Sequence, residues 1–175
     1  MRALLIISDS KESGIGRKLM LPSLKMFYKK EGWDVEVLDL AYDQFAGATV
    51  SDNMMKLRVN SYKNSIKLAD HVHFITTTQF GGMAPDLELF FNKVLTEGFA
   101  YNGKKGLLDE HAFFYLNHTK KTFIPFNIPW LRIRLTRLNN MFSSRKIFQT
   151  NQNTMNAKER MEFMKSVKSH IKSTL

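Results

Sequence analysis

Residues 3–16 read ALLIISDSKESGIG and hold the strongest structural signal in the chain. Residues 3–7 form an unbroken apolar run, which is typical of a short strand that is buried on both faces. Polar residues follow as far as Ser13, and Gly14-Ile15-Gly16 then leads into a segment with helical periodicity. A buried strand that passes through a short polar loop into a helix predicts the first unit of a parallel α/β sheet.

The rest of the chain continues this alternation of strand and helix. Further strands are predicted at residues 34–40, 72–77, 112–116 and 146–150. Helices are predicted at 13–31, from 51, from 85 to about 98, at 129–141, and from 156 onward. Strict alternation with right-handed crossovers predicts one domain, 1–175, with a parallel sheet in the doubly wound order 2-1-3-4-5 and helices on both faces.

Individual residues indicate where these helices begin and which side chains share a face. Pro22 lies inside the first predicted helix, which indicates a kink or a late start. Asn156, with Glu159 three residues later, resembles a capping box at the start of the last helix. His71 and His73 lie two residues apart on a predicted strand, so they share one face of the sheet and are interpreted as structural. Apolar residues at helical spacing predict one buried stripe on the second helix: Met55, Val59, Tyr62, Ile66 and Ala69.

The composition predicts a folded protein of the cytoplasm. The apolar fraction is 43% and the chain holds 14 Phe, which excludes disorder as a description of the whole chain. The absence of Cys excludes disulfides, a thiol nucleophile and Cys-based metal sites. The apolar run at the N-terminus is too short for a signal peptide or a membrane span, so a cytoplasmic location is expected.

The net charge of +10 is confined to the last third of the sequence. Residues 1–116 hold 14 Lys and Arg against 14 Asp and Glu, whereas residues 117–175 hold 12 Lys and Arg against two Glu. This asymmetry predicts an anionic partner for residues 117–175, such as a phosphate-bearing cofactor, an acidic protein or an anionic membrane surface. Nucleic acid is a less favoured partner, and a solvated helix face is the alternative.

Three loops are expected at the ligand-binding edge of such a sheet. Ligands bind beyond the carboxyl ends of the strands, at the switch point between the first and third strands, which selects loops 8–16, 77–83 and 117–122. Loop 8–16 leads into a helix whose free N–H groups and dipole favour an anion. Its Ser and Gly residues predict a phosphate site, and Lys11 or Arg17 would add charge; a turn that caps its helix and binds nothing is the alternative.

The second loop predicts a site for a flat ring. A buried strand ends there in hydroxyls, an aromatic residue and a glycine pair: Thr77, Thr78, Gln79, Phe80, Gly81 and Gly82. The isoalloxazine ring of a flavin requires backbone polar groups, an apolar wall and close backbone approach, which Phe80 and the two glycines supply. The alternative is an ordinary glycine turn with Phe80 in the core.

Two stretches together resemble a known family. Residues 78–84, TQFGGMA, followed by Phe90 and Phe91, look like the flavin loop of flavodoxin-like quinone reductases. Residues 94–101, VLTEGFAY, resemble the GFAY segment of the DT-diaphorase-like branch, and Ser13, five residues after Ser8, matches the phosphate-loop Ser of that family. The resemblance covers roughly residues 3–116 and 145–171.

The resemblance implies a three-layer flavodoxin-like sandwich and an enzyme. The enzyme that the resemblance implies would bind FMN, with FAD less favoured, and would form a homodimer. It would take hydride from NADH or NADPH and reduce a quinone or a similar small acceptor. The resemblance implies that phosphate contacts come from Ser8, Ser10, Ser13, Gly14, Ile15 and Gly16. The ring would lie against residues 77–82.

The third loop departs from the family pattern, which has a Thr-Gly-Gly turn where this chain has Asn117-His118-Thr119. Asn117 and Thr119 are candidates for hydrogen bonds to the flavin edge. His118 titrates near neutrality, which makes it a candidate proton donor to a reduced quinone, and a surface loop histidine is the alternative. Two rival functions stay open: a flavodoxin that only carries electrons, and a flavin-free module that docks through residues 117–175.

Overall fold

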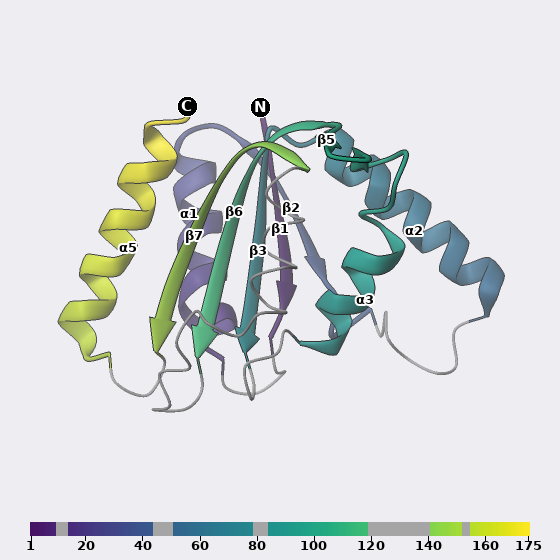
Figure 1. Cartoon of the computed structure of the whole chain (residues 1–175). Coiled ribbons are helices and arrows are strands. Elements are labelled where there is room, and N and C mark those ends of the chain that lie inside the picture. The colour runs from purple at the N-terminus through teal and green to yellow at the C-terminus, as the bar shows by residue number, and fades with distance from the viewer. Residues whose placement is uncertain (10–13, 44–50, 79–83, 119–140, 152–154) are drawn as a thin grey trace.

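The computed structural model describes residues 1–9, 14–43, 51–78, 84–118, 141–151 and 155–175. A parallel sheet of five strands, in the order β2-β1-β3-β6-β7, forms its centre (Figure 1). The strands are β1 (Arg2–Ser8), β2 (Asp34–Asp39), β3 (His71–Thr78), β6 (Leu108–His118) and β7 (Phe142–Asn151). A short antiparallel hairpin, β4 (Tyr101–Asn102) and β5 (Lys105–Gly106), stands apart from the sheet. The predicted order of the five strands is therefore confirmed.

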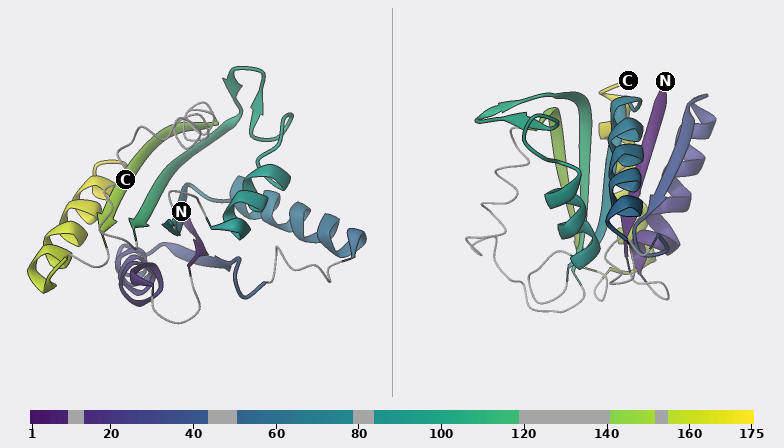
Figure 2. Two further views of the ribbon diagram at one scale, coloured as in Figure 1. Left: turned by 60° about the horizontal axis from the view of Figure 1, so that its bottom comes forward. Right: turned by 90° about the vertical axis from the view of Figure 1, so that its right-hand side faces the viewer.

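Helices cover both faces of this sheet and complete the predicted three layers (Figure 2). On one face lie α2 (Asp52–Lys67) and α3 (Pro85–Lys93), and on the other lie α1 (Leu21–Lys30) and α5 (Ala157–Lys172). The alternation of β1 accounts for the two cores, because successive side chains of a strand point to opposite faces. Leu4 and Ile6 pack in the core under α2 and α3, whereas Leu5 and Ile7 pack in the core under α1 and α5.

The first helix is irregular next to Pro22, where the sequence indicates a kink or a late start. A single π-helical turn, η1 (Gly16–Met20), leads directly into α1, and Pro22 is the second residue of α1. The change of winding therefore falls where a residue without an N–H enters the helix. At the other end of the chain, Asn156 accepts a hydrogen bond from the Glu159 N–H at 3.0 Å, while the Asn156 N–H donates to the Glu159 carboxylate at 2.7 Å. The predicted capping box is confirmed.

The predicted boundaries of three elements are wrong. The third helix ends at Lys93, not near Gly98, because Gly98, with φ of +79°, belongs to the turn that enters the β4–β5 hairpin. Strands β6 and β7 extend beyond the predicted ranges, because their ends pair with each other from Leu108 to Asn151. The helix predicted at 129–141 lies almost entirely outside the described residues. Within the described ranges, no helix combines the length and apolar character needed to cross a bilayer.

A chain of hydrogen-bonded rings lies buried under α1 and α5. The Tyr28 hydroxyl on α1 lies 2.7 Å from His71 Nδ1 and 2.7 Å from His73 Nε2, and His73 Nδ1 lies 2.9 Å from the Tyr115 hydroxyl. His71 also bonds to the backbone of Thr174 as a donor. One proton arrangement satisfies all of these contacts: Tyr115 donates to His73, His73 to Tyr28, Tyr28 to His71, and His71 to Thr174. The structural interpretation of the two histidines agrees with this geometry.

Both histidines of this chain of rings stay neutral at neutral pH. Burial lowers the pKa of His71 to about 4 and the pKa of His73 well below its ordinary value. Burial also raises the pKa of the Tyr28 and Tyr115 hydroxyls, so both remain donors. The neutral forms are those that the proton arrangement requires.

Candidate functional site

The strand register brings the predicted loops to one edge of the sheet. Ser8 pairs with Thr76, Thr77 with Asn117, and Thr78 with His118. The carboxyl ends of β1, β3 and β6 therefore meet at the lower edge in Figure 1, where β1 has β2 on one side and β3 on the other. This is the switch point of a doubly wound sheet, the usual place of a ligand.

Part of the predicted site lies outside the described residues. This holds for Ser10, Ser13, Gln79, Phe80, Gly81, Gly82 and Thr119, and for the side chains of Thr78 and His118. The backbone of His118 ends β6 beside Thr78 of β3. The proton-donor role of His118 and the ring contacts of residues 79–82 remain predictions.

Two buried hydroxyls lie at the switch point, on the face under α2 and α3. Ser8 continues the alternation of Leu4 and Ile6 on β1, and its register partner Thr76 continues that of Phe74 on β3. Each residue is 1% exposed, and neither side-chain hydroxyl has a hydrogen-bond partner in the described part of the chain. We call Ser8 and Thr76 the hydroxyl pair. Since buried polar groups nearly always have partners, the hydroxyl pair indicates a site for a polar ligand atom.

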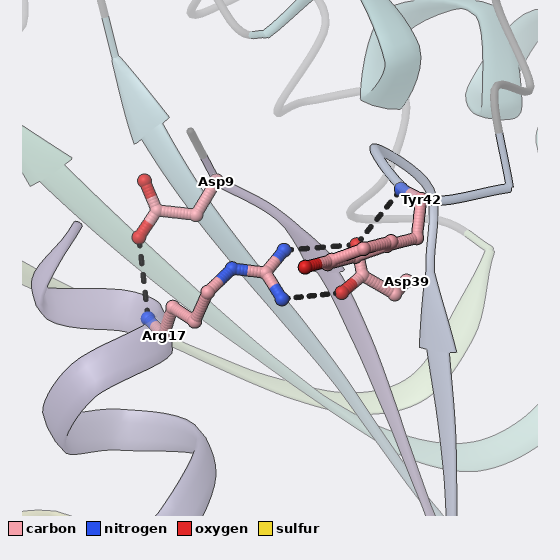
Figure 3. Close-up of polar contacts among 4 residues, drawn as sticks. All are labelled: Asp9, Arg17, Asp39 and Tyr42. Atoms are coloured by element: carbon pink, nitrogen blue, oxygen red, sulfur yellow. Dashed lines mark hydrogen bonds and ion pairs between the residues drawn. The ribbon is translucent and has the colours of Figure 1, made fainter. Parts of the chain in front are cut away.

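Asp9, which the sequence analysis did not select, occupies the opposite face of the same edge (Figure 3). Its side chain accepts hydrogen bonds from the Thr77 hydroxyl and, at 3.3 Å, from the backbone N–H of Arg17. A Cβ at Gly14 would lie 1.7 Å from Asp9 Oδ2, and one at Gly16 would lie 2.7 Å from it. The two glycines therefore make room for the Asp9 carboxylate. An acidic residue before a helix start is the sequence signal that could have revealed this contact.

Arg17 joins the start of the first helix to the end of β2. Its guanidinium binds the Asp39 carboxylate through two contacts, Nη1–Oδ2 at 2.5 Å and Nη2–Oδ1 at 2.9 Å, and lies 5.2 Å from the centre of the exposed Tyr42 ring (Figure 3). The hydrogen bond with Asp39 raises the pKa of Arg17. Arg17 was a candidate for added charge at a phosphate, but in this structure its terminal nitrogens bind Asp39.

Asn117 lies inside the edge, not on its surface. It is 1% exposed, and its side-chain oxygen accepts a hydrogen bond from the Thr150 hydroxyl at the end of β7. A Cβ at Gly16 would lie 3.4 Å from Asn117 Nδ2, so the Asn117 amide packs beneath the start of the helix. This contact links β6, β7 and the first loop. A hydrogen bond from Asn117 to a flavin remains a prediction.

The described residues fit a flavin nucleotide on one side of this edge. The hydroxyl pair supplies two buried groups that can bind ribityl or phosphate oxygens, and Gly14 and Gly16 bring backbone close to the switch point. On the other side, the Asp9 carboxylate places a negative charge at the helix start, where a phosphate is expected. The fit of the described residues is therefore to the polar chain of a flavin, with Asp9 opposing its phosphate.

Solved structures share this architecture over nearly their whole length. Smu.1420 from Streptococcus mutans is 20% identical, with a TM-score of 0.73 over 97% of both chains. The NAD(P)H:quinone oxidoreductase from Methanothermobacter marburgensis is 17% identical, with a TM-score of 0.71 over 96% of this chain and 93% of that one. The chain has the flavodoxin-like fold.

A third structure of this flavodoxin-like fold contains the cofactor that the resemblance implies. It is an FMN-dependent NADH-azoreductase from Bacillus anthracis in complex with FMN, 12% identical, with a TM-score of 0.72 over 99% of this chain and 98% of that one. No protein-family model and no curated protein matches the sequence. At these identities the likeness shows the fold alone.

Proposed function

We propose that the chain is an FMN-dependent NAD(P)H oxidoreductase that reduces quinones or similar small acceptors by hydride transfer. The observation that carries this proposal is the hydroxyl pair, Ser8 and Thr76, at the switch point of a flavodoxin-like sheet. Solved structures with this fold include a quinone oxidoreductase and an azoreductase with bound FMN, which supports the same cofactor and the same class of acceptor. A homodimer and a cytoplasmic location belong to this proposal.

The residues of the chain would bind and orient the cofactor. FMN, when bound, supplies the hydride and electron chemistry, and the protein supplies position and electrostatics. Ser8 and Thr76 would hydrogen-bond its polar chain. The backbone at 14–16, with Ser10 and Ser13, would lie toward its phosphate, and residues 77–82 would lie toward its ring.

Two contacts shape this edge before a ligand arrives. The Asp9–Thr77 hydrogen bond ties the first loop to the end of β3, and the Arg17–Asp39 ion pair ties the start of the first helix to β2. A site that is already ordered loses less conformational entropy on binding. Positioning of this kind matters for hydride transfer, because the reacting atoms must approach to about 3–3.5 Å.

Spectroscopy of the purified protein, followed by turnover assays, tests the proposal. We expect visible flavin absorption, release of FMN on denaturation, and oxidation of NADH or NADPH that requires both FMN and a quinone. The same assay separates the enzyme from a flavodoxin that only carries electrons, which would bind FMN without turnover with NAD(P)H. A colourless protein that takes up no added FMN would overturn the proposal.

One observation favours a second candidate, a flavin-free module that docks on an anionic partner. The Asp9 carboxylate already occupies the helix start at which a phosphate is expected. The last third of the chain also presents exposed basic side chains on β7 and α5: Arg145, Lys146, Lys158, Arg160, Lys165 and Lys172. Partner binding that falls steeply with added salt, in a protein that does not bind FMN, would support this candidate.

A further inference from the structure

The start of the first helix already carries a negative charge. η1 and α1 form one continuous helical segment, and the N–H of Arg17 in its first turn donates to Asp9 Oδ2 at 3.3 Å. Asp9 is 3% exposed, and its other carboxylate oxygen accepts a hydrogen bond from the Thr77 hydroxyl of β3. The carboxylate is therefore a built-in part of the edge, held by two elements.

Arg17 carries the positive charge closest in sequence to this helix start, and that charge acts on Asp39 as well as on Asp9. The Arg17 guanidinium interacts electrostatically with Asp9, but both of its terminal nitrogens bind Asp39. Figure 3 shows the two contacts of the guanidinium with Asp39 and the separate contact of Asp9 with the backbone N–H of Arg17. A phosphate that approached the same helix start would meet the helix dipole with Asp9 already placed against it. Charges that are shielded from water interact more strongly than exposed ones, so the buried Asp9 would repel the phosphate appreciably.

We propose that Asp9 determines how the flavin is held: it weakens the grip on the phosphate, so that binding depends mainly on the ring and the ribityl chain. The inference rests on the proposed function, since it concerns the same flavin site. It follows that the protein discriminates weakly between FMN and riboflavin, which differ only by the phosphate. It also follows that bound FMN exchanges readily with free FMN.

The dissociation constants of FMN and riboflavin, measured by quenching of flavin fluorescence, test this inference. In the wild-type protein we expect the two constants to agree within about tenfold. In Asp9→Asn, which keeps the shape of the side chain and removes its charge, FMN should bind about tenfold or more tightly, because the repulsion is gone. Riboflavin, which carries no phosphate, should change by no more than about twofold.

Thr77→Val is the matched control, because it removes a partner of Asp9 and leaves the carboxylate charge in place. Its ratio of riboflavin to FMN dissociation constants should equal that of the wild-type protein. The unfolding midpoint of each variant shows whether it folds, and Asp9→Ser provides a second neutral variant if Asp9→Asn does not.

The outcomes separate the inference from the proposed function. Flavin binding with the same ratio in the wild-type protein and in the neutral variants would overturn the role of Asp9 alone. Absence of both flavins from the wild-type protein and from the neutral variants would overturn the proposed function, and the inference with it. FMN affinity that rises in the neutral variants while riboflavin affinity stays unchanged would support the role of Asp9.

Discussion

Two groups of buried polar side chains differ in how their hydrogen bonds are completed. Under α1 and α5, the rings of Tyr28, His71, His73 and Tyr115 form a continuous chain of contacts in which each ring has a partner. At the carboxyl edge, the hydroxyl pair is as deeply buried, yet neither hydroxyl has a partner in the described residues. Leaving a buried polar group unsatisfied costs about 1–3 kcal/mol. The first group therefore stabilises the fold, and under the proposed function the second group is retained for a ligand.

Tyr28→Phe is expected to give the largest effect. It removes the hydroxyl that contacts both His71 Nδ1 and His73 Nε2, so two buried ring nitrogens lose a partner. The free energy of unfolding, measured in urea, should fall by about 2–4 kcal/mol. Tyr62→Phe is the matched control, because its hydroxyl donates to Asp43 at the partly exposed edge of α2, and it should cost about 1 kcal/mol. Equal losses for the two variants would contradict a special role of the ring chain.

The ring chain also predicts an acid-sensitive fold. The folded protein keeps His71 neutral down to a pKa of about 4, whereas the unfolded chain protonates it near its ordinary value of 6.5. As the pH falls through this window the unfolded state binds more protons, so stability is present above about pH 6.5 and is lost toward pH 4. His73, whose pKa is also lowered, adds to the loss.

Urea unfolding at several pH values measures this loss, which should be about 1–3 kcal/mol for His71 between pH 7 and pH 4. His71→Gln removes one of the titrating rings, and its stability should therefore depend less on pH than that of the wild-type protein. An unchanged pH dependence in this variant would contradict the lowered pKa as the cause.

Gly14→Ala tests the contact between the first loop and Asp9. The added methyl group would lie 1.7 Å from Asp9 Oδ2, so the carboxylate must move and lose its hydrogen bonds, at an expected cost of about 1–3 kcal/mol. In an Asp9→Ala background the same change should cost markedly less, because the obstacle is gone. A double-mutant cycle from urea unfolding measures this coupling, and additive losses would show that Gly14 is needed for another reason.

The hydroxyl pair should give the smallest change in stability. Ser8→Ala and Thr76→Val remove buried hydroxyls that have no partner in the described residues, so the free energy of unfolding should stay within about 0.5 kcal/mol of the wild-type value or rise slightly. Urea unfolding of the two single variants checks this. A loss above about 1 kcal/mol would indicate a structural hydrogen bond and would remove the contrast with the ring chain.

The sequence predicts the sheet better than the site. Apolar runs and helical spacing predict the alternation of strands and helices, and right-handed crossovers then predict the strand order. Period two correctly places His71 and His73 on one face. Their partner Tyr28 comes from α1, a contact that only the packing of the helix on the sheet creates. Local patterns also misplace the end of the third helix, because Gly98 serves a hairpin turn and not a helix end.

For the site, topology predicts which loops meet, and chain folding decides which way each side chain turns. Asp9 follows a buried strand and could point toward solvent or toward the core; the Thr77 hydroxyl and the glycines at 14 and 16 direct it inward. Asn117 was expected at the flavin edge, and the Thr150 hydroxyl on β7 holds its side chain inside. Thr77 lies far from Asp9 in sequence, and Thr150 lies far from Asn117, so no local pattern reveals these two contacts.

A titration of FMN into the wild-type protein and into a Ser8→Ala/Thr76→Val double variant tests the central claim most directly. The account predicts that the double variant folds with unchanged stability and binds FMN about tenfold or more weakly, because two hydrogen bonds to the ligand are lost. An equal affinity of both proteins for FMN would show that the hydroxyl pair does not contact the flavin and would contradict the claim.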